Sequence, residues 1–321
     1  PPHRPHLKFH LFYHEAVWRA SSAGAAGQPG GMFDARREYA SSANHAPRKR
    51  QRTRRGKRGM RMTWFEAVVL GMIQGLTEFL PISSTGHLAI GRHAFGLKEA
   101  GLFLDTMLHA GTLAAVVYIY RGELVRFARR PFGKTGRLLI AGTLPAAAVG
   151  LMFEDLFERL SDSGVSIGWE FLATGCFLWF AERARGGTKT MDDLRPADAF
   201  VIGLFQAGAI FPAVSRSALT IAGGLLRGLN RETAAYFSFL LSIPAIAGGV
   251  LVQGAKLFDG TAGGGADPLA LLAGAAAAAV CGYLAVRWMI GYVQRGSLKI
   301  FAVYVWALGA VVLAAQWLGR W

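Results

Sequence analysis

The chain has 321 residues, a mean hydropathy of +0.31 and a formal net charge of +15, and 52% of its residues are hydrophobic. The hydrophobic content favours a membrane protein, whereas the basic charge would suit nucleic acid or anionic lipid as a partner. Most of the charge lies in residues 1–59, which hold 13 Lys and Arg against 3 Asp and Glu. The basic run at 48–61 has no folded domain around it, so we expect membrane lipids and no nucleic acid as partners.

The segment 1–59 lacks the apolar stretch of a secretory signal. Met60 and Met62 directly precede the first periodic apolar run. We expect residues 1–59 to be a disordered or non-native extension without a role in the chemistry. Residues 60–321 then form the membrane domain. The alternative for the extension is a basic arm that binds anionic lipid.

Six stretches are apolar over roughly the 20 residues that a membrane crossing needs. They are 102–120, 137–152, 167–180, 234–252, 269–289 and 299–318. The second and third are short at their apolar centre and need their flanks to span. We therefore predict an all-α, polytopic integral membrane protein with about six transmembrane helices.

Two further apolar segments are each broken at a proline into pieces too short to span, 64–80 with 84–97 and 199–211 with 215–229. Both breaks are polar. Residues 74–87 read Gln-Gly-Leu-Thr-Glu-Phe-Leu-Pro-Ile-Ser-Ser-Thr-Gly-His, and residues 206–220 read Gln-Ala-Gly-Ala-Ile-Phe-Pro-Ala-Val-Ser-Arg-Ser-Ala-Leu-Thr. Polar groups at membrane depth are costly unless they face a cavity or a partner, which makes both motifs functional candidates. The breaks predict two re-entrant helix pairs.

The two motifs share a spacing that predicts an internal repeat. The matching residues are Gly71, Gln74, Pro81 and Ser84 in the first copy and Gly203, Gln206, Pro212 and Ser215 in the second. We divide the domain into halves of about 63–185 and 195–320, each with one re-entrant pair followed by three spans. Because three is odd, the second half enters the membrane inverted relative to the first.

The charges of the loops predict an orientation. Loops 121–137 and 287–299 are basic, whereas loops 154–165 and 253–268 carry an excess of Asp and Glu. Basic loops lie in the cytoplasm under the positive-inside rule. Both chain ends then lie outside, and the first re-entrant pair opens to the outside.

The first motif combines an acid with a helix start. Gln74 and Glu78 are four residues apart and share one helix face. Ser83 and Ser84 are typical N-cap residues of the next helix, and with Ser84 as the cap, His87 is the third helical residue. The free N–H groups of such a helix start are a phosphate site.

The second motif repeats this helix start with a cation. Ser215 is at the predicted cap, Arg216 follows it, and Thr220 lies about one turn further on. The planar guanidinium of Arg matches phosphate oxygens bidentately. One acid, one His, several hydroxyls, one Arg and two helix N-termini together suit hydrolysis of a phosphate ester or anhydride.

Several of these residues have a structural alternative. Ser and Thr in membrane helices often pack or cap, and this alternative stays open for Ser83 and Ser217. Asp105 and His109 form another pair four residues apart, at the mouth of the first span. They either contact the site residues without touching the substrate, or merely orient their helix at the membrane–water interface.

The run from Gln74 to His87 resembles the first signature of the bacterial undecaprenyl-diphosphatases, and the run from Phe211 to Thr220 resembles the second. Similar family sequence recurs at 104–112, 224–231 and 237–244, so the resemblance covers about 62–320. It implies a membrane phosphatase that converts undecaprenyl diphosphate into undecaprenyl phosphate, recycling the carrier lipid for cell-wall synthesis. It also implies the bacterial plasma (inner) membrane and a link to bacitracin resistance.

The resemblance implies roles for the motif residues. The catalytic set is Glu78, Ser84, His87 and Arg216, and the substrate-binding set is Gln74, Ser83, Thr85, Ser215, Ser217 and Thr220. The family is linked to divalent cations. Since Gln74 stands where some members carry a second Glu, Mg²⁺ or Ca²⁺ is expected to rely on Glu78 as its protein ligand, with waters and the substrate phosphates.

The second motif also departs from the family pattern, with Ala213 where a Gly is usual. If that turn needs a positive φ, Ala costs on the order of 1 kcal/mol there.

Two mechanisms and two classes of function stay open at this point. Ser84 is the favoured nucleophile with His87 as acid or base, and a metal-activated water is the rival. An inverted repeat with broken helices is also a transporter architecture, so a lipid-phosphate flippase or anion transporter is the alternative function. The sequence does not indicate an oligomeric state.

Overall fold

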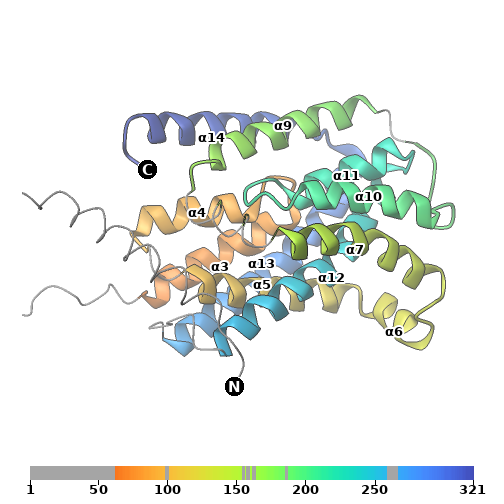
Figure 1. Ribbon diagram of the computed structural model, residues 1–321, viewed down its shortest axis with the longest axis horizontal. Helices are drawn as coiled ribbons and strands as arrows, with labels where there is room; N and C mark the ends of the chain where they lie inside the picture. Colours follow the sequence, from red (N-terminus) through yellow and green to blue (C-terminus); the bar gives the residue numbers. More distant parts are fainter. Residues whose placement is uncertain are drawn as a thin grey trace, which may run out of the picture. The chain divides into compact units, whose positions relative to one another are not determined.

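The computed structural model describes residues 62–97, 101–153, 156, 160, 164–184, 187–258 and 267–321. The predicted extension 1–59 lies outside these residues. Within them, regular structure is helical apart from one isolated β-bridge between Lys189 and Leu229. The helices, shown in Figure 1, are α3 (Trp64–Phe79), α4 (Ser84–Phe95), α5 (Gly101–Ile119), α6 (Arg121–Arg129), α7 (Lys134–Met152), α9 (Ile167–Arg183), α10 (Pro196–Gly208), α11 (Arg216–Leu226), α12 (Arg231–Phe258), α13 (Pro268–Arg295) and α14 (Lys299–Trp317).

The all-helical, multi-pass prediction is confirmed. Each of the six predicted spans coincides with a helix, namely α5, α7, α9, α12, α13 and α14. Four of the described helices, α7, α12, α13 and α14, are long and apolar enough to cross a membrane. The number rises to five if α5 and α6, which meet at a 77° bend, count as one broken span. The 17-residue α9 is too short to qualify by the same measure.

Both predicted breaks are present, between α3 and α4 and between α10 and α11. The first begins at Leu80, whose backbone is extended (φ −72°, ψ 146°), because the residue before a proline is pushed out of the helical region. Helix α3 itself begins with a capping box made by Thr63 and Glu66.

The loop predicted after the first span holds the short helix α6, stabilised in part by an Arg126–Glu123 ion pair of 2.5 Å.

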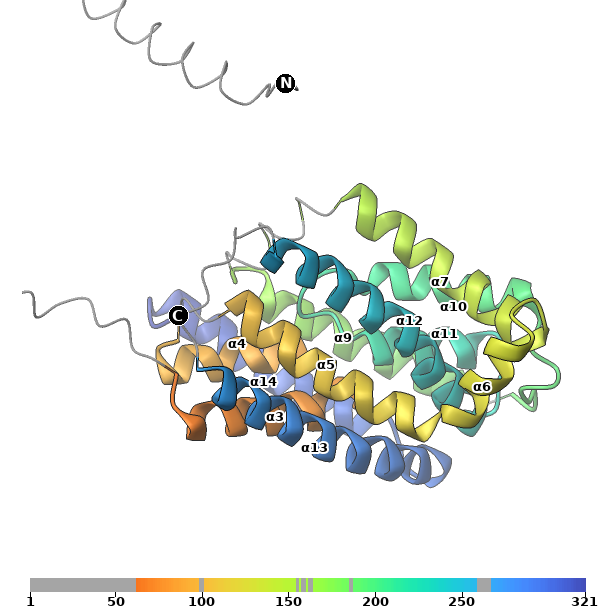
Figure 2. The same ribbon diagram turned by 90° about the horizontal axis from the view of Figure 1, so that it is seen from below.

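Each predicted half packs one helix against the other half. Helix α3 packs along α13, and helix α10 packs along α7. The repeated glycines make the same contact in both places, since a Cβ at Gly71 would collide with the carbonyl of Gly274, and one at Gly203 with the carbonyl of Gly142. Figure 2 shows α3 beside α13, and Figure 1 shows α9 beside α14. These close approaches require residues without a side chain.

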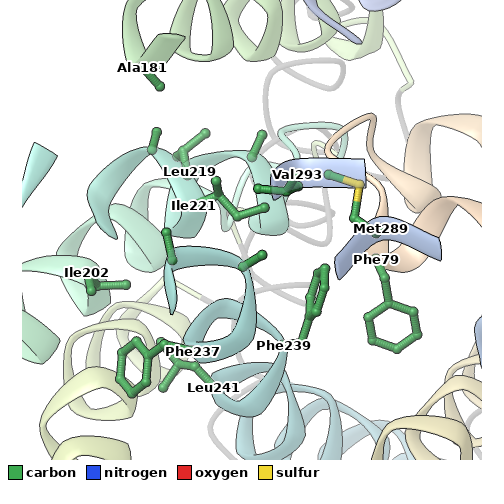
Figure 3. Packing of buried hydrophobic residues seen from close by; sticks show 14 of the residues in the cluster. Phe79, Ala181, Ile202, Leu219, Ile221, Phe237, Phe239, Leu241, Met289 and Val293 are labelled. Carbon is green, nitrogen blue, oxygen red and sulfur yellow. The ribbon is translucent and has the colours of Figure 1, made fainter. Parts of the chain in front are cut away.

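The core joins the elements that carry the two polar motifs. Phe79, the last residue of α3, meets Phe239 of α12 edge to face at 5.8 Å between ring centroids. Leu219 and Ile221 of α11 are buried in the same cluster (Figure 3). Aromatic pairs of this kind add about 0.5–1.5 kcal/mol to the burial itself. The end of α3 and the start of α11 are therefore fixed by one packed core.

Candidate active site

Two helix N-termini carry the polar motifs. Ser83 caps α4 by accepting a hydrogen bond of 3.3 Å from the Gly86 amide, so the prediction that Ser84 is the cap was wrong by one residue. Ser84 is the first helical residue, and its hydroxyl is free for another partner. Ser215 caps α11 through the Ala218 amide at 3.3 Å, as predicted.

The carboxylate of Glu78 is the centre of the polar network. Its Oε2 accepts hydrogen bonds from the Ser84 hydroxyl at 2.6 Å and from the Gln74 amide at 3.0 Å. Its Oε1 accepts from Nη2 of Arg216 at 2.9 Å, across 138 positions of sequence. Because only 8% of Glu78 is exposed, the pair with Arg216 compensates a buried charge. The two motifs therefore meet at one acid.

A cavity of about 300 Å³ opens beside this network. Its walls come from both motifs, from α5 and from α12. The lining residues are Glu78, Ser83, Ser84, Thr85, His109, Ala209, Ile210, Phe211, Pro212, Val214, Ser215, Arg216, Ala245, Ile246, Gly249, Val250 and Gln253. The lining combines acid, hydroxyl, imidazole and guanidinium groups with apolar residues of α12 and of the break that follows α10. That combination suits a ligand with an anionic head and an apolar chain.

The structure does not bring His87 into this cavity. Its Nδ1 lies 2.6 Å from the carbonyl of Ser83, and its Nε2 lies 2.8 Å from the hydroxyl of Tyr304 in α14. The ring stacks on Tyr304 and meets Phe171 edge to face. His109 lines the cavity instead, with Nε2 at 3.8 Å from Oε2 of Glu78.

Four other predicted residues lie around the site without lining the cavity. Gln74 is fully buried beside Glu78. Ser217 donates to the carbonyl of Leu80 at 2.8 Å, which ties α11 to the first break. Thr220 lies 2.6 Å from the hydroxyl of Ser238, and Asp105 pairs with Arg92 of α4. The contacts of Ser217, Thr220 and Asp105 join different helical segments, whereas that of Gln74 lies within α3.

Sequence reasoning missed the support that α9 gives to the second motif. The amide of Ala213 donates to the carboxylate of Glu170, and the amide of Ser215 donates to Thr174 at 3.1 Å. Glu170 is a buried carboxylate inside an apolar segment, and that signal was available in the sequence. Ser83 is the one described non-glycine residue with a positive φ, so the expected cost at Ala213 does not arise.

The donor set offers little for a metal held by protein alone. Among the described residues, no group of three or more His, Cys, Asp or Glu side chains could hold one. Both oxygens of Glu78 already accept hydrogen bonds, and the buried Oε1 of Gln74 beside it has no hydrogen-bond partner in the described part of the chain. The residues present fit a divalent cation that arrives with a diphosphate, whose oxygens and waters would supply most of the ligands.

Together these features define an all-helical, multi-pass membrane protein with a polar site between two helix N-termini. A family comparison gives the particular class. The protein-family model described as bacitracin resistance protein BacA matches residues 67–311 of this chain, and the chain belongs to that family.

Curated relatives cover the same region. The chain is 57% identical over 256 residues to undecaprenyl-diphosphatase 4 of Bacillus thuringiensis (strain Al Hakam), which covers 80% of this chain and 98% of the relative. It is 46% identical to the undecaprenyl-diphosphatase of Carboxydothermus hydrogenoformans, over 81% of this chain and 100% of that relative. The corresponding protein of Syntrophotalea carbinolica is 40% identical, over 79% of this chain and 99% of its own length.

Proposed function

We propose that this protein hydrolyses undecaprenyl diphosphate to undecaprenyl phosphate and inorganic phosphate. One observation carries the proposal: a single buried carboxylate, Glu78, holds the Ser84 hydroxyl at 2.6 Å and the Arg216 guanidinium at 2.9 Å on the wall of a cavity. This places an acceptor, a hydroxyl and a phosphate-binding cation within one site. The names of the curated relatives support the lipid diphosphate as the substrate.

Binding of the diphosphate uses groups that the protein leaves available. Nη1 of Arg216 is buried without a hydrogen-bond partner among the described residues, so it can donate to a phosphate oxygen. The N-termini of α4 and α11 add backbone N–H groups and partial positive charge. The apolar wall formed by Ile246, Gly249 and Val250 would contact the prenyl chain.

The reaction would start at Ser84. Its Oγ attacks the terminal phosphorus while its proton passes to Oε2 of Glu78, the atom it already contacts. The bond from phosphorus to the bridging oxygen breaks, and undecaprenyl phosphate leaves. A bound Mg²⁺ or Ca²⁺ would neutralise charge on the diphosphate, with Glu78 as its protein ligand. Arg216 stabilises the charge that develops on the transferred phosphoryl group.

We also propose the finer membrane arrangement. The helices at the six predicted spans and the two breaks support six crossings and two re-entrant pairs. The pairing of α3 with α13 and of α10 with α7 supports an inverted repeat of the halves 63–185 and 195–320. The loop charges support basic loops in the cytoplasm and a site that opens to the outer side of the bacterial inner membrane.

A phosphate-release assay separates the enzyme from the alternative function. The purified protein in detergent, with Mg²⁺ and undecaprenyl diphosphate, is expected to release inorganic phosphate at a rate proportional to protein concentration. EDTA should stop the release, and added Mg²⁺ or Ca²⁺ should restore it. A lipid-phosphate flippase or anion transporter would release none, and that result would overturn the proposal.

A further inference from the structure

His109 is the imidazole that the structure presents to the reacting groups. Its Nδ1 lies 2.7 Å from the backbone carbonyl of Asp105. A carbonyl can only accept, so Nδ1 carries the hydrogen, and in the neutral ring Nε2 is left with its lone pair. This Nε2 is directed to the Glu78 side of the cavity, 3.8 Å from Oε2.

The free nitrogen of His109 has room for a water molecule. The distance of 3.8 Å to Glu78 is too long for a direct hydrogen bond, and 25% of the His109 side chain is exposed. The same Oε2 holds the Ser84 hydroxyl at 2.6 Å. Ser84 and His109 therefore both contact or approach one carboxylate oxygen, and a phosphoryl group on Ser84 would lie within reach of a water beside His109.

The proposed reaction needs a second base, an argument that rests on the proposed function. After the first step, Glu78 holds the proton from Ser84 and must return it when the serine oxygen leaves phosphorus. Glu78 is then occupied when the attacking water has to lose its own proton. Among the described residues that line the cavity, the ionisable side chains are Glu78, His109 and Arg216, and Arg does not accept a proton.

We propose that His109 is the general base of the second half-reaction. A water molecule attacks the phosphorus of phosphorylated Ser84, and its proton passes to Nε2 of His109. The bond between phosphorus and Oγ of Ser84 breaks, and Oγ takes back the proton held by Glu78. Inorganic phosphate leaves, and His109 loses its extra proton to water. Each of the two bases thus handles one proton per turnover.

The experiment uses undecaprenyl diphosphate labelled with ³²P in its terminal phosphate, with acid quenching at short times. In His109→Gln, whose side chain cannot take the proton, labelled phosphoserine at position 84 should accumulate to about one per protein. Undecaprenyl phosphate should appear in a burst of the same size, followed by steady turnover at least roughly a hundredfold slower than wild type. His109→Ala should respond in the same way, and added imidazole should restore part of its turnover.

His93→Gln is the matched control, because His93 lies outside the cavity, stacks on Trp321 and contacts the carbonyl of Arg320. It should behave as wild type. If the His109 variants lose the burst and the steady rate together, or if imidazole restores nothing, His109 is not the second base. Wild-type protein that releases no phosphate at all would instead overturn the proposed function, so the two failures are distinguishable.

Discussion

Ser83 has a backbone φ of +70°, a conformation that costs a residue with a side chain on the order of 1–2 kcal/mol. The sharp turn that this φ allows starts α4 within a few residues of the end of α3. It also points the next side chain, Ser84, back at Glu78. Strained backbone of this kind persists where surrounding packing determines it, and here it lies beside the proposed reacting hydroxyl.

Glu78→Gln tests the acid. The amide keeps the shape of the side chain but removes the charge that accepts the Ser84 proton and pairs with Arg216. We expect kcat at saturating Mg²⁺ to fall roughly a hundredfold or more, the scale of losing one charge-stabilising group. Glu66→Gln in the same helix is the control, because Gln can still close the capping box with Thr63. Near-normal turnover of the Glu78→Gln variant would remove Glu78 from the mechanism.

Arg216→Lys tests whether the planar guanidinium is needed. One nitrogen of Arg216 holds Glu78 and another is free for phosphate, and a single ammonium cannot take both positions. We expect turnover to fall about ten- to a hundredfold, or about 1.4–2.7 kcal/mol of transition-state stabilisation. Arg227→Lys, which keeps a charge beside Asp198, should have wild-type turnover. Full activity of Arg216→Lys would mean that positive charge alone is sufficient at this position.

At the scale of elements, the broken helices could be predicted because proline and polar residues interrupt apolar runs in the sequence itself. The direction of His87 could not. Its ring is turned to α14 by Tyr304, 217 positions away, and no local pattern reports such a partner. The same holds for His109, whose distance to Glu78 depends on how α5 packs beside α3. The sequence shows which helix positions are polar. Packing against helices far away in the chain decides which of these side chains face the cavity.

Gly203→Ala tests the contact between α10 and α7. A Cβ at position 203 would collide with the backbone carbonyl of Gly142, which cannot move aside as a side chain can. Overpacking of this kind costs about 1–3 kcal/mol, so the thermal unfolding midpoint in detergent should fall by several degrees. Gly291→Ala on α13 meets no atom within 4 Å, so it should leave the midpoint unchanged or raise it slightly, because Ala favours the helix over Gly. Equal midpoints for both variants would show that the helices separate easily at Gly203.

At the scale of the whole molecule, the proposed repeat rests on the shared spacing of the two motifs and on the similar backbone contacts of Gly71 and Gly203. The number of crossings was harder to predict. Helix α9 has 17 residues and α5 bends into α6, so length and apolar content alone leave both at the margin. Neighbouring helices shield the polar groups of such segments from lipid, and the mean hydropathy of a single segment does not take this shielding into account.

The proposed orientation rests on loop charge and can be tested by labelling. In a variant whose Cys176 and Cys281 are replaced by Ala, single cysteines are introduced at Phe132 and Val165, which are 81% and 67% exposed. A membrane-impermeant maleimide added to intact cells should modify the cysteine at 165 and spare the one at 132, because basic loops lie in the cytoplasm. The reverse pattern would invert the topology and the side to which the site opens.

The most direct test of the proposed hydrolysis at Ser84 is the rate of inorganic phosphate release from undecaprenyl diphosphate by Ser84→Ala. Ser242→Ala is the matched control, since Ser242 is buried in α12 and donates to the carbonyl of Phe239 away from the cavity lining. With Ser84 as the nucleophile, its removal should lower the rate by roughly a thousandfold or more, while Ser242→Ala releases phosphate at nearly the wild-type rate. Wild-type release by a folded, membrane-inserted Ser84→Ala protein would contradict the account, because a water molecule and not the serine would then attack the phosphorus.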